Sequence, residues 1–109
     1  MQDRDRDQLK RLIEHAEAAR AYARAGGARW WTDQLTRDAV MMRIAQIAEA
    51  AKRTSPEALA EVEGVAWAEI RGMRTRIVHD YDKVDLAILR QTVAEDLDSL
   101  IANVRKVIS

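Results

Sequence analysis

The sequence predicts an all-α protein, an antiparallel up-and-down bundle of four helices with a short extra helix before the third. Apolar residues recur at steps of three and four along most of the chain. No segment shows the alternation of a half-buried strand, and capping residues, glycine or proline stand at the expected helix ends. The 109 residues, 48% hydrophobic and 33% charged, fit a single domain spanning 1–109 without internal repeats.

A first helix is predicted from about Asp5 to Ala25, and the pair Gly26–Gly27 ends it as C-terminal glycines do. We interpret the opening DRDRD, residues 3–7, as a solvated, acid-rich helix start that suits the helix dipole. His15 is expected to be exposed on this helix. The apolar face consists of Leu9, Leu12, Ile13, Ala16 and Ala23.

A second helix is predicted with Thr32 or Asp33 as its cap, continuing to Lys52 or Arg53. Both caps are short polar side chains that can accept a hydrogen bond from a free backbone N–H. Its apolar face, which we expect to be buried, consists of Leu35, Val40, Ile44, Ile47 and Ala51.

A short helix is predicted within TSPEALAEVEG, residues 54–64, with Ser55 as its N-cap and Pro56 at the first helical position. Gly64 interrupts this segment, and VAWAEIRGMRTRIVH, residues 65–79, continues as the third main helix. The final helix begins from an Asp85 cap. A single apolar stripe is expected along it, formed by Leu86, Leu89, Val93, Leu97, Leu100, Val104 and Val107.

Composition restricts the function classes. A chain this small buries a thin core, so association into a homodimer is expected to help it. The absence of cysteine excludes disulfides and thiolate chemistry and fits a cytoplasmic protein. No apolar leader or membrane-spanning stretch is present, so no membrane partner is expected. The formal net charge of +0 argues against a general nucleic-acid coat, so any phosphate site must be local.

The stretch RGMRTRIVHDYDKVD, residues 71–85, has unusual chemistry: Arg74, then His79 after four intervening residues, then Tyr81 after one more. Arginine offers a permanently charged fork that matches phosphate oxygens, and histidine can take and give a proton near neutral pH. The pair suits phosphodiester chemistry. Positions five apart on a helix point about 140° away from each other, so one chain makes a poor site. A twofold copy, or unwinding near His79, would be needed to line one cleft. The adjacent Ile77–Val78 pair is expected to be buried.

Four segments carry a resemblance to a known family, and they cover nearly the whole chain: IAQIAEAAK (44–52), WAEIRGMR (67–74), VHDY (78–81) and VDLAILRQTVAEDLDSLI (84–101). Together they resemble the HepT-like branch of the HEPN superfamily. This resemblance implies a small all-α dimer that acts as a ribonuclease toxin, encoded beside a minimal nucleotidyltransferase antitoxin of the MntA-like kind.

The resemblance carries the family's motif residue by residue onto this chain. It implies that Arg74 and His79 are catalytic and that the antitoxin adenylylates Tyr81 to silence the toxin. The chain departs from the family in having Thr75 where an asparagine is frequent after the motif arginine. The acidic stretch IGEA reads IAEA here, so Glu49 is retained without the preceding glycine. Candidate RNA contacts are Arg76 and Arg71, and candidate supporting residues are Glu49, Thr75 and Asp80.

The expected reaction is a metal-independent cleavage in which an RNA 2′-hydroxyl attacks the adjacent phosphorus. His79 would serve as general base, or as acid through its dimer mate, while Arg74 stabilises the phosphoryl oxygens. No cofactor is expected, and no His or carboxylate cluster has metal-ligand spacing around His15 or His79. The expected partners are RNA, the nucleotidyltransferase and a second copy of the chain, with higher oligomers left open.

Alternative interpretations remain open at this stage. The chain could be a non-catalytic dimer that binds RNA or a nucleotide, or it could act chiefly as the protein partner of the nucleotidyltransferase. Arg74 and His79 could instead form a structural pair with acids such as Glu69 or Asp80. Trp30–Trp31 and Trp67 are interpreted as packing or dimer anchors rather than platforms for stacked bases.

Overall fold

The computed structural model describes residues 1–108, and these residues form helices and connecting turns without any strand. The all-α prediction is therefore confirmed for the described part of the chain. No helix within it is long and apolar enough to cross a membrane. The elements, in chain order, are α1 (Asp3–Gly26), η1 (Trp30–Thr32), α2 (Gln34–Lys52), α3 (Pro56–Ala60), α4 (Trp67–His79), η2 (Tyr81–Lys83), α5 (Leu86–Gln91), η3 (Thr92–Asp96) and α6 (Leu97–Ile108).

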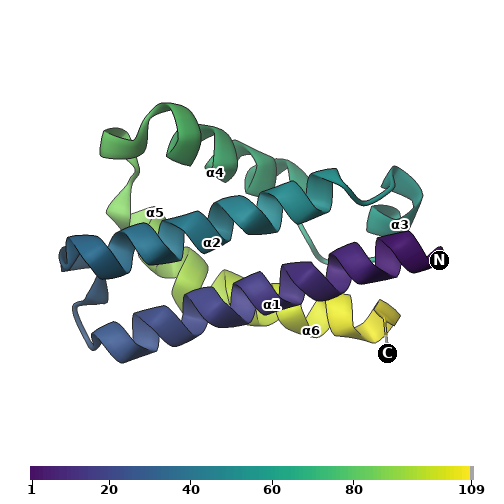
Figure 1. The fold of residues 1–109 in the computed structure, drawn as a ribbon, viewed down its shortest axis with the longest axis horizontal. Coiled ribbons are helices and arrows are strands. Elements are labelled where there is room, and N and C mark those ends of the chain that lie inside the picture. The colour runs from purple at the N-terminus through teal and green to yellow at the C-terminus, as the bar shows by residue number, and fades with distance from the viewer. Residues whose placement is uncertain (109) are drawn as a thin grey trace.

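The α1–α2 hairpin is the framework of the molecule, with the two long helices antiparallel and in contact along their lengths (Figure 1). The turn between them depends on Gly27, whose φ of 88° favours glycine, and on Gly26, where an added Cβ would lie only 2.8 Å from a Thr36 methyl carbon. Asp33 caps α2 as predicted, because its carboxylate accepts hydrogen bonds from the backbone N–H and hydroxyl of Thr36 at 2.9 and 2.7 Å.

The start of α1 is tied to the start of α3. Ser55 caps α3 as predicted, with its Oγ accepting from the Ala58 N–H at 3.2 Å. Asp5 in turn accepts hydrogen bonds from the Ser55 N–H and Oγ–H, both at 2.8 Å, and is only 4% exposed. The prediction that DRDRD is a solvated helix start is wrong at Asp5, because the carboxylate satisfies donors 50 residues away.

The final helical segment is not one regular helix. Asp85 caps it as predicted, accepting from the Ala87 and Ile88 N–H groups at 2.8 and 3.3 Å. A π-helical turn, η3, then separates α5 from α6. This wider turn changes the direction in which later side chains point. The predicted stripe is buried at Leu89, Val93, Leu97, Leu100 and Val104, but Leu86 is exposed and Val107 is half-buried.

Two further burial predictions are wrong. Leu35 is 81% exposed, because the apolar face of α2 that α1 covers begins only about a turn later in the chain. Val78 is 53% exposed beside Ile77, which is 8% exposed. Successive helix residues point about 100° apart, so a helix that packs on one side buries only one of such a pair.

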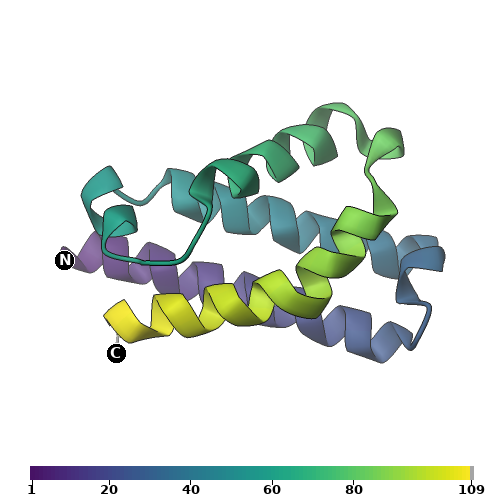
Figure 2. The same ribbon diagram turned by 180° about the vertical axis from the view of Figure 1, so that it is seen from behind.

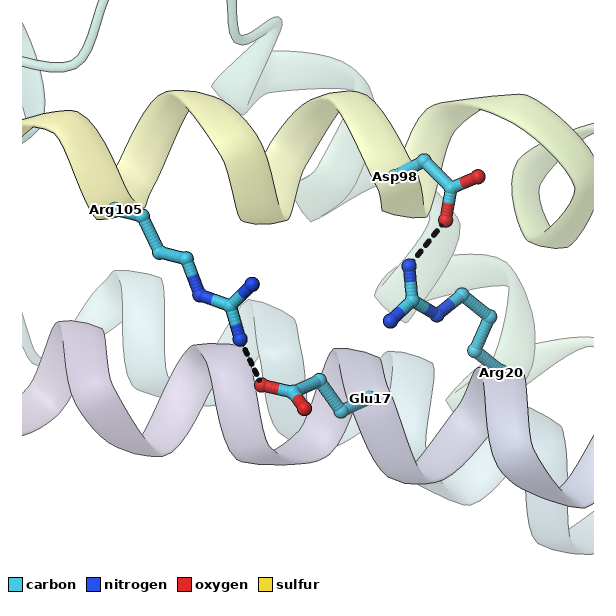
Figure 3. Close-up of polar contacts among 4 residues, drawn as sticks. All are labelled: Glu17, Arg20, Asp98 and Arg105. Atoms are coloured by element: carbon cyan, nitrogen blue, oxygen red, sulfur yellow. Dashed lines mark hydrogen bonds and ion pairs between the residues drawn. The ribbon is translucent and has the colours of Figure 1, made fainter.

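The C-terminal helix packs on α1, and ion pairs join the two helices at the surface (Figure 3). Arg20 of α1 pairs with Asp98, and Arg105 of α6 pairs with Glu17 at 2.8 Å. The core of the molecule includes Leu9, Leu12, Leu97, Leu100 and Val104, all at most 5% exposed.

The α4 helix has fewer neighbours. It packs on α2 and diverges from α6, so that the two helices open away from each other when the molecule is seen from behind (Figure 2). Three helices, α1, α2 and α6, thus form the packed part of the molecule, and α4 lies on one side of it. The regular up-and-down bundle and the dimer stay predictions.

Candidate active site

The helix α4 carries the motif and is held on α2 by few anchors. Met73 and Ile77, each 8% exposed and four residues apart, form its buried face. At its first residue, the Trp67 indole N–H donates to the Leu59 carbonyl oxygen at 3.2 Å. Trp67 is therefore a packing anchor, as predicted. Ile70 is also partly buried against the core, while Glu69, Arg71 and Thr75 are exposed.

Arg74 is positioned by an ion pair across the α2–α4 contact. Its Nη2 lies 2.6 Å from Oε1 of Glu49, and the two side chains are 34% and 27% exposed. Partial burial on both sides restricts the guanidinium to one place on the surface of α2. The structure thus gives Arg74 an acidic partner, but that partner is Glu49 rather than Glu69 or Asp80.

His79 is the last residue of α4 and is exposed. The helix stays regular up to this point, since the Asp80 N–H still donates to the Arg76 carbonyl oxygen at 2.8 Å. Unwinding near His79 is therefore not what brings the motif residues together. Arg74 faces Glu49 on α2, while a residue five positions later on the same helix points about 140° away. Within one chain, Arg74 and His79 therefore lie on different faces of α4.

Tyr81 follows directly in η2 and is 36% exposed. The turn that presents it is stabilised by the backbone of Asp80, whose carbonyl oxygen accepts from the Lys83 N–H at 2.8 Å. Asp80 is itself exposed and lies between the last helical residue and Tyr81. The imidazole and the phenol of the motif therefore lie in an open segment at the end of α4.

The other predicted contacts differ in their availability. Arg71 and Arg76 are exposed on α4. The Thr75 hydroxyl donates to the Arg71 carbonyl oxygen at 3.2 Å, so that hydroxyl is engaged within its own helix. Arg76 also lines a groove of about 610 Å³ between α4 and the α5–α6 segment. Arg74 and His79 do not line this groove, whose walls are largely apolar and include Ile44, Met73, Ile88, Leu97 and Leu100.

A second polar cluster, away from the motif, joins α1 to α2. Arg43 donates from Nη1 to His15 Nδ1 and from Nη2 to the Tyr22 hydroxyl, both at 3.0 Å. Burial and the neighbouring Arg43 charge lower the pKa of His15. His15 was predicted to be exposed, and this is wrong: it is half-buried. Its spacing from Leu12 and Ala19, which are both fully buried, was the available signal.

The three tryptophans serve packing, as predicted. Trp30 is buried and meets Trp31 edge to face, with ring centroids 6.0 Å apart. Trp31 also lies under the guanidinium of Arg90, 3.6 Å from the ring centroid. Among residues 1–108, no group of three His, Asp or Glu side chains is placed to hold a metal ion.

The structure defines a small all-helical protein whose α4 carries an arginine and a histidine separated by four residues. The chain belongs to the HepT-like family, described as ribonuclease HepT-like, whose model matches residues 12–107. It is also similar to a protein named "Probable ribonuclease HepT" from Thermococcus cleftensis, with 34% identity over 68 residues. That match spans 62% of each chain, less than two thirds of the relative. No solved structure matches significantly.

Proposed function

We propose that this protein is the ribonuclease toxin of a toxin–antitoxin pair, a metal-independent RNA endonuclease whose active site is shared between two copies of the chain. Membership of the ribonuclease HepT-like family supports the reaction class. The observation that carries the proposal is the placement of the motif, with Arg74 of α4 paired with Glu49, His79 exposed at the last position of α4 and Tyr81 exposed in η2.

The dimer supplies what one chain lacks. Arg74 and His79 of one chain diverge around α4, but a twofold axis beside the exposed end of this helix would place two arginines and two histidines around a single cleft. The apolar groove, together with the exposed Val78 of α4 and Ile88 of α5, provides surface for such an association. The two copies then form one site around one RNA backbone.

In this site the reaction is a transesterification. The His79 imidazole removes the proton from an RNA 2′-hydroxyl, the 2′-oxygen forms a bond to the adjacent phosphorus, and the bond from phosphorus to the 5′-oxygen breaks. The imidazolium of the second copy donates its proton to the departing 5′-oxygen. Arg74 donates hydrogen bonds to the non-bridging oxygens as their charge increases. The products are a 2′,3′-cyclic phosphate and a 5′-hydroxyl.

Adenylylation of Tyr81 by a nucleotidyltransferase antitoxin would silence the reaction. Tyr81 is exposed and lies two residues after His79, so its hydroxyl is accessible to a modifying enzyme. An attached adenylyl group adds a bulky anionic phosphodiester close to the imidazole. It would exclude the substrate phosphate both by its volume and by charge repulsion.

The decisive experiment compares the wild type with His79→Ala in RNA cleavage assays in the presence of a metal chelator. We expect His79→Ala to lower the cleavage rate by about 10²–10⁴-fold with an unchanged melting curve, because the side chain is exposed and serves only in proton transfer. His15→Gln removes the other histidine and serves as the matched control, which should retain cleavage.

Other outcomes separate the alternatives. Wild-type protein that binds RNA without ever releasing products would identify a non-catalytic RNA-binding dimer. Equal cleavage by the wild type and by His79→Ala would refute the assignment of His79. A monomer in solution at assay concentrations that still cleaves would refute the shared site.

A further inference from the structure

A second basic site lies at the end of the molecule that also carries the end of α4. The α1–α2 connection, which contains η1, and the start of α5 both lie at this end (Figure 1). Trp31 of η1 is the centre of the site. It is half-buried and contacts two arginines from different helices.

The two guanidinium groups are held by different parts of Trp31. Arg90 of α5 stacks on the indole with its Cζ atom 3.6 Å from the ring centroid. Arg37 of α2 donates from Nη1 to the Trp31 carbonyl oxygen at 2.9 Å. Arg29, which is exposed, lies one residue before η1. Arginine side chains normally lose much rotamer freedom on binding a ligand, and here part of that loss has already occurred in the free protein.

The positive charge of this site is not neutralised by an ion pair. Within residues 1–108 the ion pairs involve Arg20, Arg74 and Arg105, and none involves the arginines around Trp31. Asp33 lies two residues after Trp31, and the half-buried Asp38 directly follows Arg37. Hydrogen bonds from the Thr36 N–H and hydroxyl lower the pKa of Asp33, with a smaller contribution from the charge of Arg37. That carboxylate is engaged in capping α2.

We propose that Trp31, Arg90 and Arg37 form an accessory binding site for single-stranded RNA, which extends the substrate beyond the catalytic cleft. A guanidinium stacked on an indole has a second planar face on which a base can stack, and its N–H edge can donate to phosphate oxygens. Arg37 and Arg29 add phosphate contacts along the same surface. This inference rests on the proposed ribonuclease function, because it assumes that RNA is the ligand.

The position of Arg90 connects this site to the motif. Arg90 is nine residues after Tyr81, and the intervening chain passes through η2 and the Asp85 cap into α5. An RNA strand whose scissile phosphate lies near His79 would place neighbouring nucleotides over this end of the molecule. The site would therefore increase affinity for longer RNAs without touching the reacting atoms.

The test measures RNA binding and cleavage separately. Binding of a labelled single-stranded RNA of about 12 nucleotides is measured in the His79→Ala background, at several salt concentrations. The variants are Arg90→Gln, Arg90→Lys and Arg37→Gln. The matched control is Arg53→Gln, which removes the same charge from an exposed position at the opposite end of α2. Cleavage of a dinucleotide and of the longer RNA is then compared among the same variants with the native His79 in place.

We expect Arg90→Gln to weaken binding of the longer RNA by roughly 5- to 10-fold. The slope of the logarithm of the binding constant against the logarithm of the salt concentration should become less steep by about 0.7. Arg90→Lys should keep the slope while losing part of the affinity, since it keeps the charge but not the planar stack. Dinucleotide cleavage should be unchanged, and only the longer RNA should show a raised KM.

Two results would overturn the inference. One is wild-type affinity and slope for Arg90→Gln with a normal melting curve. The other is an equal loss of affinity in Arg53→Gln, which would indicate only general electrostatics. Failure of the wild type to cleave any RNA would refute the proposed function, whereas the binding measurements would still decide the accessory site.

Discussion

The α1–α2–α6 part of the molecule and the α4 helix differ in how many of their side chains are buried. Seven residues of α2 and seven of α1 are buried, whereas α4 buries only Met73 and Ile77. The packed part carries the tertiary cap at Asp5 and the surface ion pairs with α6. The α4 helix carries the motif. Most of the buried core and the proposed catalytic residues therefore lie in different parts of a 109-residue chain, and the following substitutions test the contribution of the packed part.

The largest expected effect on stability is in the packed part. Leu12 is fully buried, so Leu12→Ala should lower the free energy of unfolding by about 2–5 kcal/mol through lost burial and the cavity left behind. Leu35→Ala is the matched control at an 81% exposed position and should change the free energy of unfolding by less than about 0.5 kcal/mol. Denaturant unfolding measures both. Similar losses in the two variants would contradict the assigned core.

A smaller effect, which depends on pH, is expected at Asp5. Hydrogen bonds from the Ser55 N–H, and next from its hydroxyl, lower the pKa of Asp5 below its ordinary value of 3.8. A carboxylate with a lowered folded-state pKa contributes stability that is present above its unfolded value and is lost as the pH falls through the folded one. Asp5→Asn should therefore reduce stability at neutral pH and flatten its fall in acid.

Thermal unfolding measured as a function of pH checks this expectation. Asp7→Asn, at an exposed position on the same helix, is the control and should follow the wild type. A wild-type acid profile in Asp5→Asn would show that the link between α1 and α3 does not contribute.

The smallest effect is expected for the ion pair between Arg20 and Asp98. These side chains are 32% and 58% exposed, and pairs of this kind contribute about 0.2–1 kcal/mol. A double-mutant cycle with Arg20→Ala and Asp98→Ala measures the coupling, which should decrease at high salt. Coupling well above this range would mean that α6 is held by charge as much as by its apolar face.

Much of this architecture could be predicted from local sequence signals. The caps at Asp33, Ser55 and Asp85, and the apolar face of α1, follow from short-range chemistry and periodicity, and the structure confirms them. The partner of Asp5 could not be predicted, because the donors belong to a residue 50 positions away. The π-helical turn η3 also could not be predicted, because apolar residues spaced three and four apart are compatible with one wide turn in the helix.

The candidate site shows the same limit. Spacing and resemblance identified Arg74, His79 and Tyr81 as motif residues, and their roles stay predictions. The choice of Glu49 as the acid that contacts Arg74 depends on how α4 lies across α2, which no local pattern specifies. The stacking of Arg90 on Trp31 joins two segments that are far apart in sequence and was not predicted for the same reason.

The sparse anchoring of α4 also bears on how such a protein can diverge. Because Met73 and Ile77 are the only buried side chains of α4, with Trp67 and Ile70 partly buried against the core, its exposed positions can mutate at little cost to folding. The exposed surface of this helix can therefore change in evolution while the hairpin beneath it stays unchanged.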